Sequence, residues 1–392
     1  MTTAGRPGAG AAPELPPLSL YIHVPWCVRK CPYCDFNSHA LRGELPEQAY
    51  ADRVVADLTS ELEDVAGRPI GTLFFGGGTP SLLSPATIGD ILERLQARVA
   101  FAADAEITLE ANPGTAEAGR FRGYRAAGVN RLSIGVQSFS DAALQRLGRI
   151  HDGDEAGRAL HLARAAGFER INLDLMHGLP GQDPTAALAD LEHALDLGVD
   201  HLSWYQLTIE PNTEFHSRPP LLPVEEALED IEAAGIERLA GAGLERYEVS
   251  AWAREGEACR HNLNYWRFGD YLGLGPGAHG KLTRRGPEGL EIVRTQRTRA
   301  PGDWLGAGDG APRRMVSAVA PAERRVEFML NVLRLSAGVD EALFEARTGL
   351  PLAAISETLA ALRAEGLMRA HDIALTPLGS RFLDRVVGRF LD

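Results

Sequence analysis

Cysteine is scarce in this chain: only Cys27, Cys31, Cys34 and Cys259 occur among its 392 residues. So few cysteines cannot build the dense disulfide framework that stabilises small secreted domains. Three of the four lie within eight residues, with the spacing C-x3-C-x2-C. A cluster this tight in a cysteine-poor chain indicates a metal or redox site in a reducing compartment.

Long apolar runs are also missing. No stretch of about 18 apolar residues occurs, so the sequence predicts no transmembrane segment. The first residues, MTTAGRPGAGAAPELPPL, lack the continuous apolar core of a secretory signal and are rich in glycine, alanine and proline. This composition predicts a disordered tail over residues 1–18. We therefore expect a cytoplasmic protein.

Positive charge is in deficit: 40 lysines and arginines stand against 53 aspartates and glutamates, which gives a net charge of −13. A protein that binds nucleic acid or anionic membranes mainly through charge carries the opposite excess. We therefore expect no nucleic-acid partner. The hydrophobic content of 45% is ordinary for a globular protein, and a chain of this length can form two domains.

Short apolar segments alternate with longer helical patterns over the first 250 residues. Strands are predicted over residues 19–24, 70–75, 105–111, 131–137, 170–180 and 201–208. Helices are predicted over residues 46–67, 85–98, 116–127, 141–166, 184–197 and 224–242. Six β-then-α units predict an α/β fold with a parallel sheet and crossover helices. We expect a partial (β/α)6 barrel over residues 19–253, with its site where the strands end.

The remainder of the chain reads differently. Over residues 254–312 the pattern is looser and contains the segment CRHNLNYWRFGDYLGLGPGAHG, followed by a charged, glycine-rich connection. Residues 313–392 predict helix, helix, short strand and helix, which is a winged-helix-like layout. From residue 321 onward nine arginines face ten acidic residues. This balance favours a packing or docking domain over a DNA-binding one.

The clustered cysteines are too few for a closed zinc site, which uses four ligands, commonly as two C-x2-C pairs. Only one such pair is present, and Cys259 lies 225 residues beyond Cys34. Iron–sulfur cubanes are bound by cysteine thiolates, often in one compact loop. Three thiolates bind three irons and leave the fourth iron free for an exchangeable ligand. The spacing therefore predicts a [4Fe–4S] cluster on Cys27, Cys31 and Cys34.

The segment YIHVPWCVRKCPYCDF resembles the signature of the radical S-adenosylmethionine (SAM) proteins. GGGTP, LEANP, SIGVQSF and NLDLMHGLPGQ are similar to segments of the coproporphyrinogen-oxidase-like (HemN/HemW) branch of that superfamily, and together these segments cover nearly the whole chain. The resemblance implies a partial radical-SAM barrel, in which SAM chelates the free iron through its amino and carboxylate groups. It also implies a set of SAM-binding residues: Tyr21, Tyr33, Gly77, Gly78, Thr79, Glu110, Gln137, Arg149 and Asp174.

The residue types at these positions suit such a cofactor. Glycines let the backbone approach a ligand closely. Glu110, Gln137, Arg149 and Asp174 stand at or just past predicted strand ends and offer donors and acceptors for hydroxyl, ammonium and carboxylate groups. Any one of them could equally be a solvated loop residue or a helix cap.

The segment HNLNYW, residues 261–266, raises a second question. A histidine beside aromatic residues is usually packed or capped, but imidazole also ligates haem iron, and aromatic rings suit a flat porphyrin. H-N-x-x-Y-W resembles the haem-binding motif of the haem chaperones of this branch, which lack oxidase activity. The resemblance implies haem binding at His261. It leaves open whether Cys259 is a second axial ligand and whether His279 lines the same pocket.

Two departures separate this chain from the oxidases of the branch. Those enzymes carry a fourth cysteine two residues after the third, where this chain has Phe36, and they extend further before the cluster loop, where only a short tail precedes Ser19. The resemblance thus implies a haem chaperone that transfers haem to an acceptor protein. It leaves open a homodimer, transient contact with membrane haem proteins, and whether the protein is an enzyme. The alternatives are the radical-SAM oxidative decarboxylation of coproporphyrinogen III without oxygen, and radical chemistry on another substrate.

Overall fold

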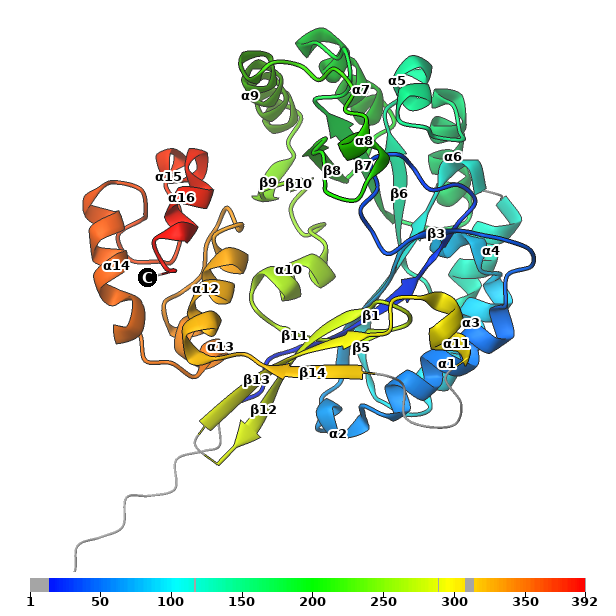
Figure 1. Ribbon diagram of the computed structural model, residues 1–392. Coiled ribbons are helices and arrows are strands. Elements are labelled where there is room, and N and C mark those ends of the chain that lie inside the picture. The colour runs from blue at the N-terminus through cyan, green and yellow to red at the C-terminus, as the bar shows by residue number, and fades with distance from the viewer. Residues whose placement is uncertain (1–13, 116–117, 288, 307–313, 392) are drawn as a thin grey trace, which may run out of the picture.

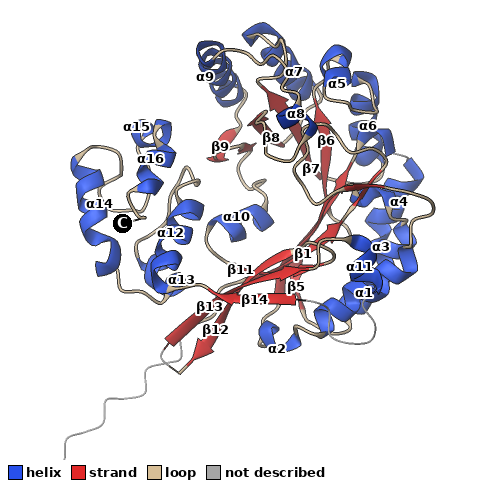
Figure 2. Cartoon of the chain, viewed as in Figure 1, coloured by secondary structure: helices blue, strands red, loops and turns tan. Residues whose placement is uncertain are grey.

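The computed structural model describes residues 14–115, 118–287, 289–306 and 314–391 (Figure 1). Its centre is a twelve-stranded sheet in the order β14-β13-β12-β11-β1-β4-β5-β6-β7-β8-β10-β9. Within the described ranges the ladder ends at β14 and β9, so the sheet curves without closing. The crossover helices lie on the outside of this curve and the strands line the inside (Figure 2).

Six strands in the middle of the sheet are parallel and follow one another in chain order. This confirms the predicted α/β fold and its succession of β/α units. The six strands are β1 (Leu18–Val24), β4 (Ile70–Gly77), β5 (Phe101–Ala111), β6 (Arg131–Gln137), β7 (Arg170–His177) and β8 (His201–Gln206).

Alternate residues of these strands face opposite sides, because the side-chain period of a strand is two. The outward residues are apolar and form the main core with the helices, as Leu20, Leu73 and Leu109 do. The inward residues are largely polar, and Ser19 and Thr72 are hydrogen-bonded to each other there. The inner side of the sheet is therefore a polar-lined space in which a ligand site can form.

The crossover helices cover the outer side, as predicted (Figure 1). Their bounds are α1 (Glu47–Thr59), α2 (Leu62–Val65), α3 (Pro85–Gln96), α4 (Ala118–Ala127), α5 (Asp141–Arg146), α6 (Gly153–Ala165), α7 (Pro184–Asp196) and α9 (Glu225–Gly241). Two other short helices are η1 (Pro80–Leu82) and α8 (Glu214–Ser217).

The helix predicted over residues 141–166 is divided into α5 and α6. Gly148 has φ 68°, which takes the chain out of the first helix, and Asp152 starts the second through a capping box with Glu155. The break matters because it places Arg149 in a loop at the carboxyl end of the sheet. The helix predicted over residues 46–67 is likewise divided, at Ser60, whose hydroxyl donates to the Asp57 carbonyl.

Residues 254–312 contain regular structure that the sequence did not predict: α10 (Arg260–Trp266), β11 (Asp270–Leu274), β12 (His279–Gly286), β13 (Gly289–Arg297) and α11 (Pro301–Gly306). β11 pairs in parallel with β1, and the sheet continues antiparallel to β14 (Arg314–Ala318). The charges that suggested a loose connection are partly buried as pairs. Lys281 lies 2.8 Å from Asp270, and both side chains are almost inaccessible to solvent.

On the other side, β8 pairs with β10 (Ala251–Ala253), which pairs with β9 (Glu245–Glu248). The predicted tail over residues 1–18 mostly lies outside the described residues. Its predicted end needs correction: Leu18 is the first residue of β1 and is buried, and the Pro17 carbonyl accepts a hydrogen bond from the Asp270 N–H.

The C-terminal unit has a hydrophobic core of its own, built around residues such as Phe328, Phe344 and Leu359. Its helices are α12 (Pro321–Val332), α13 (Ala342–Thr348), α14 (Ala353–Ala364), α15 (Pro377–Arg381) and α16 (Leu383–Gly388). Short antiparallel bridges, Val339 to Ile373 and Met368 to Leu375, complete the predicted winged-helix-like layout. None of the described helices combines the length and the apolar character that a bilayer span requires.

Candidate functional site

The clustered cysteines lie in the segment that follows β1: Cys27 ends the two-residue strand β2 (Trp26–Cys27), and Cys31 and Cys34 lie in the loop between β2 and β3 (His39–Ala40). All three thiols are free and partly exposed. The Cys34 N–H donates to the Cys31 carbonyl at 3.1 Å, and Cys34 Sγ lies 3.4 Å from Ser38 Oγ. Burial raises the pKa of the Cys27 thiol. The three sulfurs line one cavity of about 280 Å³.

The glycine segment after β4 packs directly on the cysteine loop. The Gly78 N–H donates to the Val24 carbonyl at 2.7 Å, and the Thr79 N–H donates to the Trp26 carbonyl at 2.8 Å. A Cβ on Gly78 would lie 2.6 Å from that Trp26 oxygen, and Gly77 has φ 111°. Both positions therefore require glycine. The N–H groups of Gly78 and Thr79 are already used in hydrogen bonds within the protein. The first role of this glycine segment is therefore to hold the two loops together.

Two carboxyl groups face the same cavity. Glu110 accepts a hydrogen bond from the Gly77 N–H at 3.1 Å, and Asp174 accepts from Ser133 and Asn172 at 3.0 and 2.7 Å. Burial, together with the charge of Asp174, raises the pKa of Glu110 to about 8, and burial raises the pKa of Asp174 as well. Neither carboxyl makes a salt bridge to any described residue. Such a pair suits a ligand with an ammonium group.

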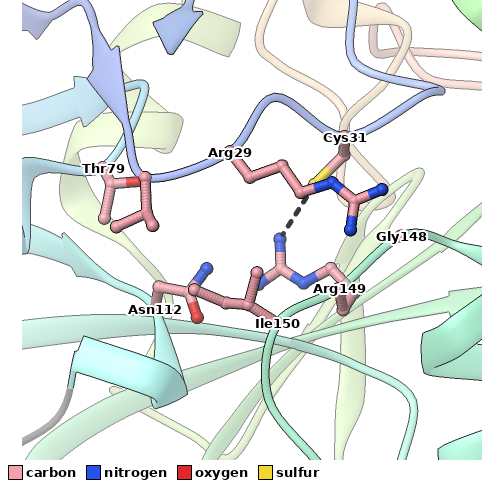
Figure 3. A pocket seen from close by; sticks show the side chains of 8 residues that line it. Arg29, Cys31, Thr79, Asn112, Gly148, Arg149 and Ile150 are labelled. Carbon is pink, nitrogen blue, oxygen red and sulfur yellow. Dashed lines mark hydrogen bonds between the residues drawn. The ribbon is translucent and has the colours of Figure 1, made fainter. Parts of the chain in front are cut away.

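Gln137 and Arg149 complete the wall of this cavity. Gln137 has φ 71°, a strained conformation for a non-glycine residue, and its Oε1 accepts from Tyr205 Oη at 2.7 Å. Arg149 donates through Nη2 to the Gly135 carbonyl at 2.6 Å and through Nη1 to Cys31 Sγ at 3.6 Å (Figure 3). Arg149 therefore links the carboxyl end of β6 to one of the three clustered cysteines.

The structure thus brings together most of the thirteen cluster-, SAM- and haem-binding residues that the sequence predicted. Eleven of the thirteen line the cavity described above: Cys27, Cys31, Tyr33, Cys34, Gly77, Gly78, Thr79, Glu110, Gln137, Arg149 and Asp174. The other two, Tyr21 and His261, line a second pocket of about 680 Å³. Phe36, Gly77 and Glu110 line both spaces, so the two adjoin.

The second pocket has a largely aromatic wall. It is lined by Tyr21, Phe74, Tyr265, Trp266 and Tyr271, besides His261 and several polar side chains. The His261 ring lies 5.1 Å from the ring of Phe74. A concave, mostly apolar space with a few polar groups is what a small-molecule site requires.

The orientation of His261 is defined by a chain of hydrogen bonds. Its Nδ1 lies 2.8 Å from Thr72 Oγ1, and Thr72 donates its hydroxyl hydrogen to Ser19 Oγ at 2.8 Å. His261 Nδ1 must therefore carry the proton that it donates to Thr72, which leaves Nε2 with a free lone pair. Burial lowers the pKa of His261 to about 4, so the ring is neutral at pH 7. A neutral imidazole with a fixed tautomer is suited to ligate a metal.

The helix that carries His261, α10, lies on the inner side of the sheet, between β1, β4 and the C-terminal unit (Figure 1). Asn264 Nδ2 donates to Ser19 Oγ and to the Asp270 carbonyl, at 2.8 and 2.9 Å. On the opposite side, the Arg334 guanidinium lies 4.4 Å from the centre of the Trp266 ring. One short helix therefore contacts the pocket, the sheet and the C-terminal unit.

The structure shows where Cys259 and His279 lie, whose roles the sequence left open. Cys259 is buried, donates from Sγ to Glu106 Oε1 at 3.5 Å and does not line the pocket. Burial raises the pKa of its thiol to about 11, so it is a poor candidate for an axial ligand. His279, whose place was left open, does line the pocket. Phe36, which replaces the fourth cysteine of the oxidases, is 58% exposed.

The cysteine loop fits an iron–sulfur cubane better than a single ion. Among the residues described, no three histidine, cysteine or acidic side chains converge as the ligands of one metal ion would. A cubane binds each thiolate at a different iron, so its ligands are spread around the cluster. Three partly exposed thiols around one cavity, with Arg149 beside Cys31, have this arrangement.

Comparison with protein families identifies the class. Residues 21–198 match the model of the radical SAM superfamily, and residues 319–382 match the model of the HemN C-terminal domain. The first range holds the cysteine loop and every residue that lines the first cavity except Tyr205, and the second holds most of the C-terminal unit. These matches define a radical SAM protein.

Individual relatives define the branch. The chain is 51% identical to the protein named heme chaperone HemW of Escherichia coli, over 96% of this chain and 99% of that one. It is 48% identical to heme chaperone HemW of Haemophilus influenzae, over 97% and 99%. The solved structure of coproporphyrinogen III oxidase (HemN) from Escherichia coli matches with a TM-score of 0.79 and 25% identity, over 96% of this chain and 90% of that one. The chain belongs to the HemN/HemW branch of the radical SAM superfamily, and within it to the HemW family.

Several residues of the site were not found from the sequence. Ser19 and Thr72 orient His261, and Tyr205 contacts Gln137. A signal was present, because each is a polar or amphipathic residue at an inward position of a strand whose outward residues are apolar. The partners that these side chains meet depend on the register between strands, which the sequence does not give.

Proposed function

We propose that this protein is a haem chaperone that binds haem through His261 and transfers it to an acceptor protein. The observation that carries the proposal is the geometry of His261: its Nδ1 is engaged by Thr72, and the ring borders an aromatic-lined pocket of about 680 Å³. Relatives named heme chaperone, about half identical over nearly the whole chain, support the same function.

The adjoining cavity would hold the resident cofactors. Cys27, Cys31 and Cys34 would bind a [4Fe–4S] cluster. The eight predicted SAM-binding residues of this cavity, together with Tyr21 from the adjoining pocket, would bind SAM. When bound, a reduced cluster supplies an electron to SAM. The chain's own residues have simpler tasks: Glu110 and Asp174 offer buried carboxyls to an ammonium, and Arg149 orients Cys31 by donating to its sulfur.

The shared wall between the two spaces suggests how they could communicate. Phe36, Gly77 and Glu110 border both, so a ligand in one cavity contacts residues that also face the other. We propose that cluster and SAM binding gate haem release or the formation of a homodimer. Transfer would take place in the cytoplasm, with transient contact when the acceptor is a membrane haem protein.

A second candidate function is the oxygen-independent oxidation of coproporphyrinogen III. The fold similarity to HemN supports it, and the pocket beside the cluster cavity could hold a porphyrinogen. Phe36, in place of the fourth cysteine, is the feature that favours the chaperone instead. Whether SAM is cleaved separates the two functions.

The test is an anaerobic reconstitution of the [4Fe–4S] cluster, followed by haem titration of the wild type and of His261→Ala. A haem chaperone loses the Soret shift in His261→Ala, keeps its cluster absorbance and turns over no coproporphyrinogen. Unchanged haem binding in the variant, together with coproporphyrinogen decarboxylation by the wild type, would support the oxidase.

A further inference from the structure

One wall of the second pocket carries three polar side chains without partners. Within the described residues, the side chains of His279, Gln296 and Arg299 make no hydrogen bond and no salt bridge, although all three line the pocket. His279 and Arg299 are exposed and Gln296 is half-buried, so their donors are open to a ligand from solvent. Several other polar groups of the pocket have partners within the protein. His23, for example, contacts Tyr21 Oη through Nδ1 and the Asn37 carbonyl through Nε2, each at 3.0 Å.

These three side chains belong to one region of the fold. His279 in β12 and Gln296 in β13 are directly paired in the antiparallel ladder. Directly paired residues have neighbouring side chains. Arg299 follows β13, and its carbonyl accepts from Asn37 Nδ2 at 2.9 Å, which ties it to the cysteine loop. The region therefore presents one cation and two neutral donors at the pocket wall.

This region lies apart from His261 across the sheet. The register puts His279 level with Phe74, because Tyr21 in β1 pairs with Phe74 on one side and with Gly273, opposite His279, on the other. β11 and β1 stand between β12 and β4, so three strand spacings, roughly 14 Å, separate the two positions. The aromatic wall lies with His261, so an elongated ligand would meet rings at one end and donors at the other.

The charges at the donor end favour an anion. Two acidic residues also line the pocket, Asp35 and Glu110. Asp35 is exposed on the cysteine loop, and Glu110 has a pKa of about 8, raised by burial and by Asp174, so it is mostly uncharged at pH 7. Arg299 has no acidic partner within salt-bridge distance among the described residues. A guanidinium with open donors is well suited to a carboxylate.

We propose that His279, Gln296 and Arg299 form a carboxylate subsite that binds the propionate groups of the tetrapyrrole, with Arg299 as the ionic partner. The proposal rests on the proposed function, since it concerns the same pocket. It orients the ligand: the macrocycle lies toward Phe74, Tyr265 and His261, and the acid groups lie toward β12 and β13.

The test compares haem with its dimethyl ester, which keeps the macrocycle and iron but lacks the anionic groups. Both are titrated into the full, anaerobically reconstituted chain, as wild type, Arg299→Met and the control Arg122→Met, an exposed arginine on α4. The wild type should prefer haem to the ester by about tenfold. In Arg299→Met this preference should shrink to about twofold through weaker haem binding alone. Arg299→Lys should recover part of it, and Arg122→Met should behave as the wild type.

The outcomes separate the subsite from the function. If Arg299→Met keeps the wild-type preference while His261→Ala loses haem, the subsite is wrong and the chaperone function stands. A wild type that binds haem and ester equally also overturns the subsite. If neither variant changes haem binding, the pocket is not the haem site, and both proposals fail.

Discussion

The Nδ1 of His261 lies 2.8 Å from the hydroxyl oxygen of Thr72, and that hydroxyl donates in turn to Ser19. Three elements far apart in the chain, α10, β4 and β1, thereby fix the tautomer of one imidazole. The ring nitrogen left over, Nε2, is the one that a metal needs. Thr72 is hydrogen-bonded to the proposed metal ligand, His261, but does not itself bind the metal. Loss of such a hydrogen-bond partner commonly lowers metal affinity about tenfold or more.

Thr72→Val is the direct test of that contact, because it removes the hydroxyl and keeps the shape. The haem affinity of the variant should fall about tenfold, and the Soret maximum should shift, since the imidazole is no longer held in one tautomer. Absorbance titration measures both. The matched control is Thr59→Val, because the Thr59 hydroxyl donates to the Val55 carbonyl within α1 and accepts from Arg98 Nε, and neither residue lines the pocket. An unchanged spectrum and affinity in Thr72→Val would show that the contact does not orient an axial ligand.

The raised pKa of Glu110, about 8, predicts a pH-dependent binding of SAM. The ammonium group of SAM interacts more strongly with an ionised carboxylate, so SAM binding at pH 7 should release the proton of Glu110. The affinity for SAM should rise with pH until Glu110 is already ionised in the free protein. The rise is at most about tenfold per pH unit. Calorimetry of the reconstituted protein in buffers of different ionisation enthalpy counts the proton. Glu110→Gln should bind more weakly and show a flatter profile from pH 7 to 8.5; an equally steep profile would exclude Glu110 as the source.

The positive φ of Gln137 predicts a conflict between stability and binding. Glycine relieves the strain at φ 71°, whereas alanine keeps it, so Gln137→Gly should be more stable than Gln137→Ala by about 1 kcal/mol. Both variants remove the acceptor of Tyr205 and should bind SAM more weakly. Chemical denaturation measures the first effect, and SAM titration the second. Equal stability of the two variants would mean that the backbone relaxes when the side chain is lost.

The buried pair of Asp270 in β11 and Lys281 in β12 predicts that the stability of these strands depends strongly on both charges. Lys281→Met leaves a buried carboxylate with Arg68, 2.7 Å away, as its remaining cationic partner, and should cost about 3 kcal/mol of unfolding free energy. Arg260→Met breaks a pair with Asp104 that is largely exposed, and should have a far smaller effect. Urea denaturation compares them. Equal losses in the two variants would contradict the view that burial makes the first pair essential.

Part of this molecule could be predicted from its sequence because strong local signals exist. The six parallel strands follow from apolar segments between helical patterns, and the cluster cysteines follow from their spacing. β11, β12 and β13 were missed because glycines and charges interrupt them, and Lys281 is accommodated in the interior only through Asp270. The division at Gly148 that positions Arg149 was also missed, since a single glycine within a helical pattern is usually tolerated.

The inward-facing residues of the sheet show why the contacts within the site could not be predicted from the sequence. Its polar residues recur at every second position of the strands, so a period-two pattern was visible. Which of them meet depends on register, and the contact of Thr72 with His261 joins residues 189 positions apart. Local propensity carries no information about such a pair.

The central claim is that Nε2 of His261 ligates the haem iron. It is tested most directly by pulsed electron paramagnetic resonance of the ferric haem complex, prepared from protein with ¹⁵N-labelled histidine. We expect a hyperfine coupling from one histidine nitrogen in the wild type, and its loss in His261→Ala with the iron–sulfur cluster intact. A histidine coupling that survives in His261→Ala, or none in the wild type, would contradict it.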